Sequence, residues 1–222
     1  MLFRILESVV PPVARAIWRP IVVGRDNVPS SGGVLLASNH LSFVDSVVIP
    51  SVAPRTVVFL AKSDYFTGTG LTGALQRAWF EALGMLPVDR DDTKSALESL
   101  DVALDVLRRG EAFGIYPEGT RSRDGRLYRG RTGAAHLALT AGVPIVPVGL
   151  RGTERIQPIG SSIPRLVKVH VTFGTPIDPR GRYDGVALGK ARRLLTDEVM
   201  TAIQALSGQE EAGVYNERPS ED

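Results

Sequence analysis

Short, nearly continuous apolar runs constrain the fold of this chain more than any other sequence feature. They comprise residues 33–37, 57–60 and 145–150. Runs of this length are typical of strands that are buried on both faces of a parallel sheet. Segments with apolar residues at helical spacing separate them, at residues 97–107, 132–141 and 186–206. Strands that alternate with helices predict an α/β fold, a single domain with a mixed, largely parallel β-sheet flanked by helices.

The length of 222 residues suits one domain, which we expect to occupy residues 23–207. Residues 1–22 place apolar side chains near helical spacing between arginines, which predicts an amphipathic helical segment. That segment either covers the core of the domain or attaches to a membrane interface. No apolar run reaches the ~18 residues that a transmembrane helix needs. Residues 208–222 are polar and acidic, and we expect them to be disordered.

The charge is unevenly distributed along the chain. The formal net charge is +2, but residues 208–222 hold five acids and one base, so residues 1–207 carry +6. Such an excess favours an anionic partner, namely a phosphate, a nucleic acid or a membrane surface. The chain contains no cysteine and only three histidines, which excludes disulfides, iron–sulfur clusters and thiol nucleophiles. We therefore predict no metal centre.

A histidine and an aspartate follow the first apolar run directly, as His40 and Asp45. Open α/β sheets bind ligands at the carboxyl ends of their strands, so this pair lies where a site is expected. A histidine suits general-base work near neutral pH, and a carboxylate can fix its tautomer. On one continuous helix the two side chains would point about 140° apart. They meet only if His40 lies in a turn and Asp45 in the first helical turn; the alternative is a structural helix cap.

A second motif leads from an apolar strand at residues 113–115 into a turn rich in glycine and arginine. Backbone N–H groups near Gly119 and Thr120, together with the Arg121 guanidinium, could surround an anion. The other interpretation is a solvated surface loop.

Four ordered blocks of the sequence resemble the glycerolipid acyltransferase family. Residues 39–45 match its Asn-His-x4-Asp block, and residues 83–90 resemble a second block that leads from Gly to Arg. Residues 116–122 are similar to Phe-Pro-Glu-Gly-Thr-Arg-Ser, with Tyr116 in place of Phe. Residues 143–148 match Val-Pro-Ile-x-Pro-Val.

This resemblance implies a role for each matching residue. His40 would be the general base and Asp45 would orient it. The substrate-binding residues would be Lys62, Arg90, Glu118, Gly119, Thr120 and Arg121. Arg121 would bind the acceptor phosphate, while Glu118 would hold either the loop or the glycerol. The family resemblance implies direct transfer from acyl-CoA or acyl-acyl carrier protein as co-substrate, with no acyl-enzyme and no bound cofactor.

The expected activity is transfer of a fatty acyl chain to the sn-2 hydroxyl of 1-acyl-glycerol-3-phosphate (lysophosphatidic acid), which forms phosphatidic acid. Glycerol-3-phosphate, another lysophospholipid or a glycolipid are alternative acceptors, and a noncatalytic lipid-binding domain is the alternative class. The partners would be this membrane lipid, the acyl thioester and a membrane surface, reached as a peripheral or monotopic protein at the cytoplasmic face of the cell membrane. A nucleic-acid partner is disfavoured because only 6% of residues are aromatic.

Overall fold

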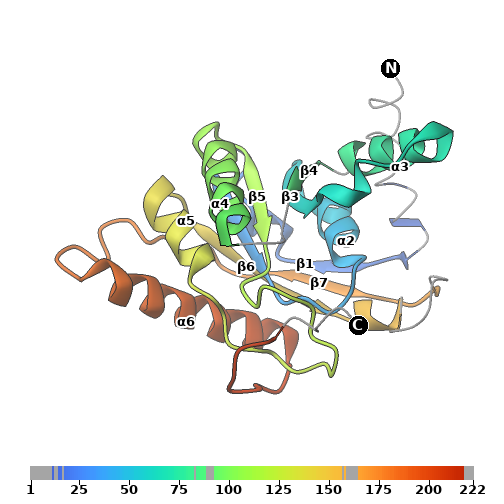
Figure 1. Ribbon diagram of the computed structural model, residues 1–222. Helices are drawn as coiled ribbons and strands as arrows, with labels where there is room; N and C mark the ends of the chain where they lie inside the picture. The colour runs from blue at the N-terminus through green and yellow to red at the C-terminus, as the bar shows by residue number, and fades with distance from the viewer. Residues whose placement is uncertain are drawn as a thin grey trace.

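Seven strands form one sheet in the computed structural model, which describes residues 12, 15, 16, 18–82, 84–88, 93–156, 158 and 165–217 (Figure 1). The spatial order is β1-β7-β6-β2-β5-β3-β4. All neighbouring pairs are parallel except β6 with β7. The strands are β1 (Ile21–Val23), β2 (Val34–Ser38), β3 (Val57–Lys62), β4 (Met85–Val88), β5 (Ala112–Ile115), β6 (Ile145–Arg151) and β7 (His170–Phe173). The predicted fold class is confirmed.

Helices cover both faces of this sheet, as Figure 1 shows. They are α2 (Asp45–Val52), α3 (Gly70–Ala82), α4 (Thr93–Arg108), α5 (Gly133–Ala141) and α6 (Leu188–Ser207), with short 3-10 helices at Arg25–Asn27, Ser63–Tyr65 and Thr153–Arg155. The apolar spacing at residues 97–107, 132–141 and 186–206 corresponds to α4, α5 and α6. The strand β4 and the helix α3 were not expected as elements.

Alternating strand side chains build a separate core on each face of the sheet. Leu36 and Phe59 belong to the core under α2 and α3, whereas Leu35 and Phe113 belong to the core under α4, α5 and α6. All four side chains are buried. The strands are therefore apolar on both faces, which is why they read as continuous apolar runs.

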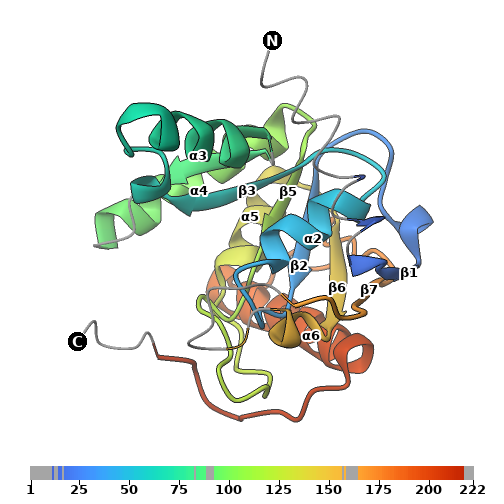
Figure 2. The same ribbon diagram turned by 90° about the vertical axis from the view of Figure 1, so that its right-hand side faces the viewer.

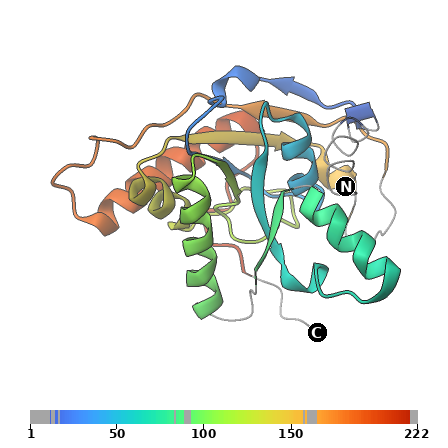
Figure 3. The same ribbon diagram turned by 90° about the horizontal axis from the view of Figure 1, so that it is seen from above.

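The first strand corrects the expected boundary between residues 22 and 23. Ile21 aligns with His170 of β7, and its N–H donates to the Val169 carbonyl over 2.9 Å. The first strand thus begins at Ile21, inside the expected amphipathic segment. β1 is the outermost strand on one side of the sheet (Figure 3). Residues 1–11, 13, 14 and 17 of that segment lie outside the described residues. No described helix is long and apolar enough to cross a bilayer.

The expectation that residues 208–222 are disordered is wrong for residues 208–217. This C-terminal segment lies against the loop that follows β5, as Figure 2 shows. Its backbone makes hydrogen bonds with that of the loop, a form of stabilisation that composition does not reveal. Residues 218–222 lie outside the described residues.

The sheet topology gathers the sequence motifs at one edge. The strands β2, β5, β3 and β4 are adjacent and parallel, so their carboxyl ends lie at the same edge of the sheet. His40 follows the end of β2, Tyr116 follows the end of β5, and Lys62 is the last residue of β3. This edge is where open α/β sheets bind their ligands.

Candidate active site

A buried carboxylate holds the candidate base. His40 lies in the turn after β2, and Asp45 is the first residue of α2. Their side chains meet through Nδ1 and Oδ2 at 2.8 Å, the arrangement that the spacing requires. The same Oδ2 accepts the N–H groups of Leu41 (2.7 Å) and Ser42 (2.8 Å), so Asp45 shapes the turn and orients the ring together. The Asp45 side chain is fully buried, while that of His40 is 15% exposed.

The backbone of His40 is fixed from the other side by the loop after β5. Its N–H donates to Glu118 Oε1 over 3.0 Å, and its carbonyl accepts the Ser122 N–H over 2.8 Å. The second oxygen of Glu118 accepts the Tyr128 N–H over 2.9 Å. One carboxylate therefore joins the turn after β2 to both ends of the loop.

The ring of His40 stacks on Tyr116, a contact that the sequence did not suggest. The ring centroids are 3.8 Å apart and the planes differ by 8°. The Tyr116 hydroxyl forms a 2.8 Å hydrogen bond with the Ser46 hydroxyl on α2. Phe59 packs against the tyrosine at 5.5 Å between centroids. The available signal was a tyrosine directly after an apolar strand, because a partly buried hydroxyl needs a hydrogen-bond partner.

Glu118 is an acid whose environment disfavours its charge. Burial raises the pKa of its carboxyl from the ordinary value of 4.5 to about 7, although the N–H donors from Tyr128 and His40 act in the opposite direction. The side chain has no exposed surface. Of the two expected roles, this placement favours holding the loop over contacting the glycerol.

The loop residues after Glu118 divide into a turn and an exposed cation. Gly119 has a left-handed φ of 81°, and its N–H donates to the Tyr116 carbonyl over 3.0 Å. That N–H is therefore not available to an anion, which corrects the expected cradle. Thr120 is partly exposed and Arg121 is exposed. No described carboxylate forms a salt bridge with the Arg121 guanidinium.

Lys62 and Arg90 are the two other residues expected to bind the substrate. Lys62 ends β3 opposite Val88 of β4, so its backbone lies at the same edge of the sheet as His40. Arg90 lies outside the described residues. In the part of the chain that the structure describes, no group of three His, Asp or Glu side chains is arranged to hold a metal ion.

This arrangement suits His40 to accept a proton from a substrate, with the cationic side chain of Arg121 on the neighbouring loop. Because Nδ1 of His40 faces the Asp45 carboxylate, Nε2 is the ring nitrogen that remains to accept a proton. The buried carboxylate stabilises the imidazolium that would form. Arg121 is exposed and directly precedes Ser122, whose N–H donates to the His40 carbonyl.

Comparisons with known proteins place this chain among acyltransferases. Residues 19–151 match the protein family described as "Acyltransferase". A 1-acyl-sn-glycerol-3-phosphate acyltransferase of Brassica napus chloroplasts is 34% identical over 65% of this chain and 40% of its own length. A probable 1-acyl-sn-glycerol-3-phosphate acyltransferase of Mycoplasma pneumoniae is 29% identical over 72% of this chain and 62% of its own length. The chain thus spans about two fifths to three fifths of these relatives.

A solved structure shares the fold. The crystal structure of PlsC, the 1-acyl-sn-glycerophosphate acyltransferase of Thermotoga maritima, superposes with a TM-score of 0.70 at 24% sequence identity. The match covers 92% of this chain and 79% of that one. At this identity the likeness supports the arrangement of strands and helices.

The raised pKa of Glu118 predicts a specific pH dependence of stability. In the unfolded chain this carboxyl loses its proton near pH 4.5, whereas in the folded protein it does so near pH 7. The folded state therefore binds more protons in this window, and stability falls as the pH rises through it. Relative to Glu118→Gln, the free energy of unfolding of the unaltered protein should fall by roughly 1–3 kcal/mol from pH 4.5 to pH 8.

Urea unfolding across this pH range measures the effect. Glu154→Gln is the matched control, because it removes the carboxylate of an exposed glutamate and should preserve the pH dependence of the unaltered protein. A constant difference between the unaltered protein and Glu118→Gln would show that Glu118 is ordinary in its titration.

Proposed function

Because the chain belongs to the acyltransferase family, we propose that it transfers a fatty acyl chain from a thioester to the sn-2 hydroxyl of 1-acyl-glycerol-3-phosphate. The product is phosphatidic acid. One observation carries the proposal: His40 and Asp45 meet at 2.8 Å beside the loop that bears Arg121. The names of the relatives from Brassica napus and Mycoplasma pneumoniae support the choice of acceptor.

The reaction begins with proton transfer to His40. Its Nε2 takes the proton of the sn-2 hydroxyl while the hydroxyl oxygen attacks the thioester carbonyl carbon. The Asp45 carboxylate stabilises the imidazolium through Nδ1. Stacking on Tyr116 and the hydrogen bonds to Glu118 and Ser122 keep the base in place. Such a preset geometry lowers the entropic cost of reaching the transition state.

The tetrahedral intermediate then collapses. The carbon–sulfur bond breaks, the thiol leaves as coenzyme A or acyl carrier protein, and His40 returns its proton to the sulfur. Direct transfer of this kind forms no acyl-enzyme, so the chain needs no nucleophile of its own. The thioester is a co-substrate, and the reaction uses no bound cofactor.

Basic side chains bind the acceptor phosphate. Arg121 is the principal ligand, because its guanidinium is exposed and a guanidinium can bind two phosphate oxygens at once. Lys62 at the end of β3 and Arg90 beyond β4 supply further positive charge. Gly119 and Thr120 shape the turn that presents Arg121. Glu118 fixes that turn through its hydrogen bonds with the N–H groups of His40 and Tyr128.

The acceptor is a lipid, so we place the protein peripherally at the cytoplasmic face of the membrane. Arg15 and Arg19 are exposed just before β1, and Ile21 on that edge strand is 44% exposed. Cations beside apolar side chains favour an anionic lipid interface. Ile21 pairs with His170 of β7, and His170 pairs with Arg151, the last residue of β6, so the start of β1 lies level with the carboxyl end of β6. This is the sheet edge that carries His40.

Competition between acceptors tests the proposed reaction. Purified protein is offered an acyl thioester with equal amounts of 1-acyl-glycerol-3-phosphate, glycerol-3-phosphate, an uncharged monoacylglycerol and a lysophosphatidylcholine, and the products are identified by mass spectrometry. We expect phosphatidic acid to predominate. Arg121→Ala should reduce its formation by about 10–100-fold, the loss expected when a charge-assisted hydrogen bond to phosphate is removed.

Arg126→Ala is the matched control for this assay, because Arg126 lies on the same loop but pairs with Asp124 over 2.7 Å. It should preserve the acceptor preference. Predominant acylation of any other acceptor by the unaltered protein would overturn the choice of substrate. Absence of any product would favour a lipid-binding domain.

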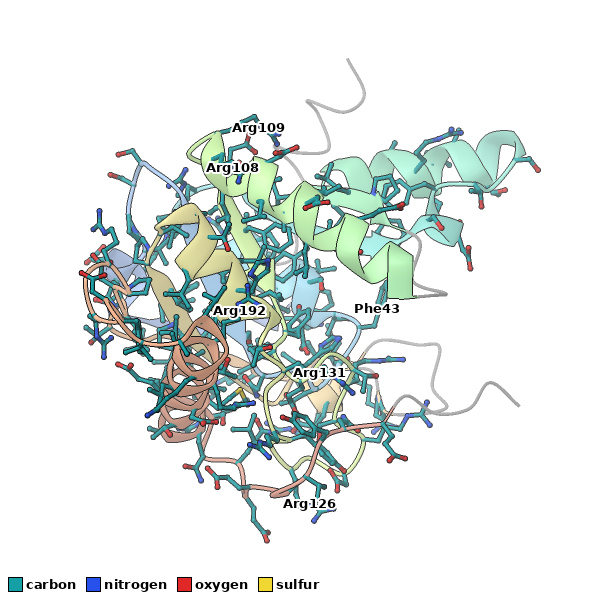
Figure 4. The ribbon with its side chains drawn as sticks, turned by 60° about the vertical axis from the view of Figure 1, so that its left-hand side comes forward. Phe43, Arg108, Arg109, Arg126, Arg131 and Arg192 are labelled. Atoms are coloured by element: carbon teal, nitrogen blue, oxygen red, sulfur yellow. The ribbon has the colours of Figure 1, made fainter. Side chains whose placement is uncertain are left out.

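Charge reversal near β1 tests the membrane placement. Arg19→Glu should weaken binding to vesicles that contain phosphatidylglycerol by roughly tenfold, since each basic residue near an anionic surface contributes about 1 kcal/mol. Vesicle flotation measures the bound fraction. Arg108→Glu is the control: Arg108 ends α4 ahead of β5, at the opposite edge of the sheet, and lies far from Arg126 in Figure 4. Equal binding by both variants would refute this orientation.

A further inference from the structure

The C-terminal segment, residues 208–217, forms part of the candidate site although it lies beyond the matched family region of residues 19–151. It starts at Gly208, which ends α6 with a left-handed φ of 68° and donates its N–H to the Gln204 carbonyl. From there the segment crosses the loop between β5 and α5. Figure 4 shows Arg126 and Arg131 of that loop beside the C-terminal segment.

Backbone hydrogen bonds pair the middle of the segment with the loop. The Leu127 N–H donates to the Glu210 carbonyl over 2.8 Å, and the Ala212 N–H donates to the Leu127 carbonyl over 2.8 Å. The Arg129 N–H donates to the Val214 carbonyl over 2.9 Å. The C-terminal segment and the loop therefore run parallel to each other here, and the hydrogen bonds fix their register.

Side chains fasten both ends of this contact to the catalytic motifs. At the start, Gln209 accepts a hydrogen bond from the Asn39 amide over 2.7 Å and donates to the Gly125 carbonyl over 2.8 Å. At the end, the amide of Asn216 donates to the Arg121 carbonyl over 3.1 Å and to that of Thr120 over 3.5 Å. Asn216 is only 9% exposed.

Two arginines of the loop contact Tyr215 and Asn216, at the end of the C-terminal segment. The guanidinium carbons of Arg129 and Arg131 lie 5.1 and 5.6 Å from the centre of the Tyr215 ring, within the range of cation–π attraction. Arg131 also donates to the Asn216 carbonyl over 3.2 Å. The asparagine is thereby held from both sides.

We propose that Asn216 is a positioning residue that fixes the backbone of Arg121, so that its guanidinium meets the acceptor phosphate at a set distance from His40. The inference rests on the proposed function, in which Arg121 binds that phosphate. The Arg121 carbonyl is held by Asn216, and the next residue, Ser122, is held by the His40 carbonyl. Only the flexible side chain of Arg121 remains to be ordered when the acceptor binds, which reduces the cost of binding.

Steady-state kinetics with Asn216→Ala test this role. We expect the KM for 1-acyl-glycerol-3-phosphate to rise about five- to tenfold, the effect of losing one hydrogen bond. The KM for the thioester and the kcat should stay near those of the unaltered protein. Val214→Ala is the matched control, because its side chain is 59% exposed and its backbone carbonyl is retained.

Combining Asn216→Ala with Arg121→Ala shows whether the asparagine acts through the arginine. The double variant should bind the acceptor no more weakly than Arg121→Ala alone. Additive losses, an unchanged acceptor KM in Asn216→Ala, or equal changes in both KM values and kcat would overturn the proposal.

Hydrogen exchange separates this inference from the proposed function. Backbone amides of residues 119–123 should exchange faster in Asn216→Ala than in the unaltered protein or in Val214→Ala. Unchanged exchange refutes the positioning role whichever lipid is acylated. If Arg121→Ala leaves the acceptor KM unchanged while exchange in Asn216→Ala rises, the assigned phosphate ligand is wrong and the segment holds the loop for another purpose.

Discussion

The site depends on the two hydrogen bonds that the buried carboxylate of Glu118 accepts. The carboxylate accepts one N–H from His40 and one from Tyr128, and so ties the turn after β2 to the loop after β5. The parallel pairing of β2 with β5 brings these segments to the same edge of the sheet. Without a charged or polar bridge, the two backbone N–H groups would be left buried and unpaired, which is costly. Burial in turn raises the pKa of Glu118 to about 7.

Local sequence signals predicted the parts of the site that are built from neighbouring residues. The spacing of His40 and Asp45 required a turn followed by a helix, and the structure has that arrangement because α2 begins at Asp45. Continuous apolar runs indicated strands buried on both faces. The strand β1 was missed because three residues beside arginines resemble the end of an amphipathic helix.

Contacts between distant segments could not be predicted in the same way. Tyr116 stacks on a histidine far away in the sequence, and Asn216 reaches a carbonyl 95 residues away. Neither contact has a periodic pattern, and the polar composition of residues 208–217 favours disorder when judged alone. The hydrogen bonds of that segment can form only with the folded loop after β5, which supplies their partners. A site of this kind combines a local motif with a scaffold that tertiary structure supplies.

His40, oriented by Asp45, is the proposed base for acyl transfer, and the function of the site depends on it. The most direct test compares the turnover of phosphatidic acid by the unaltered protein and by His40→Ala at saturating thioester and acceptor. We expect His40→Ala to lose about 10²–10⁴-fold in turnover, the usual contribution of a general base, with an unchanged melting temperature and unchanged vesicle binding. Turnover by a folded His40→Ala protein within a few-fold of the unaltered rate would contradict it.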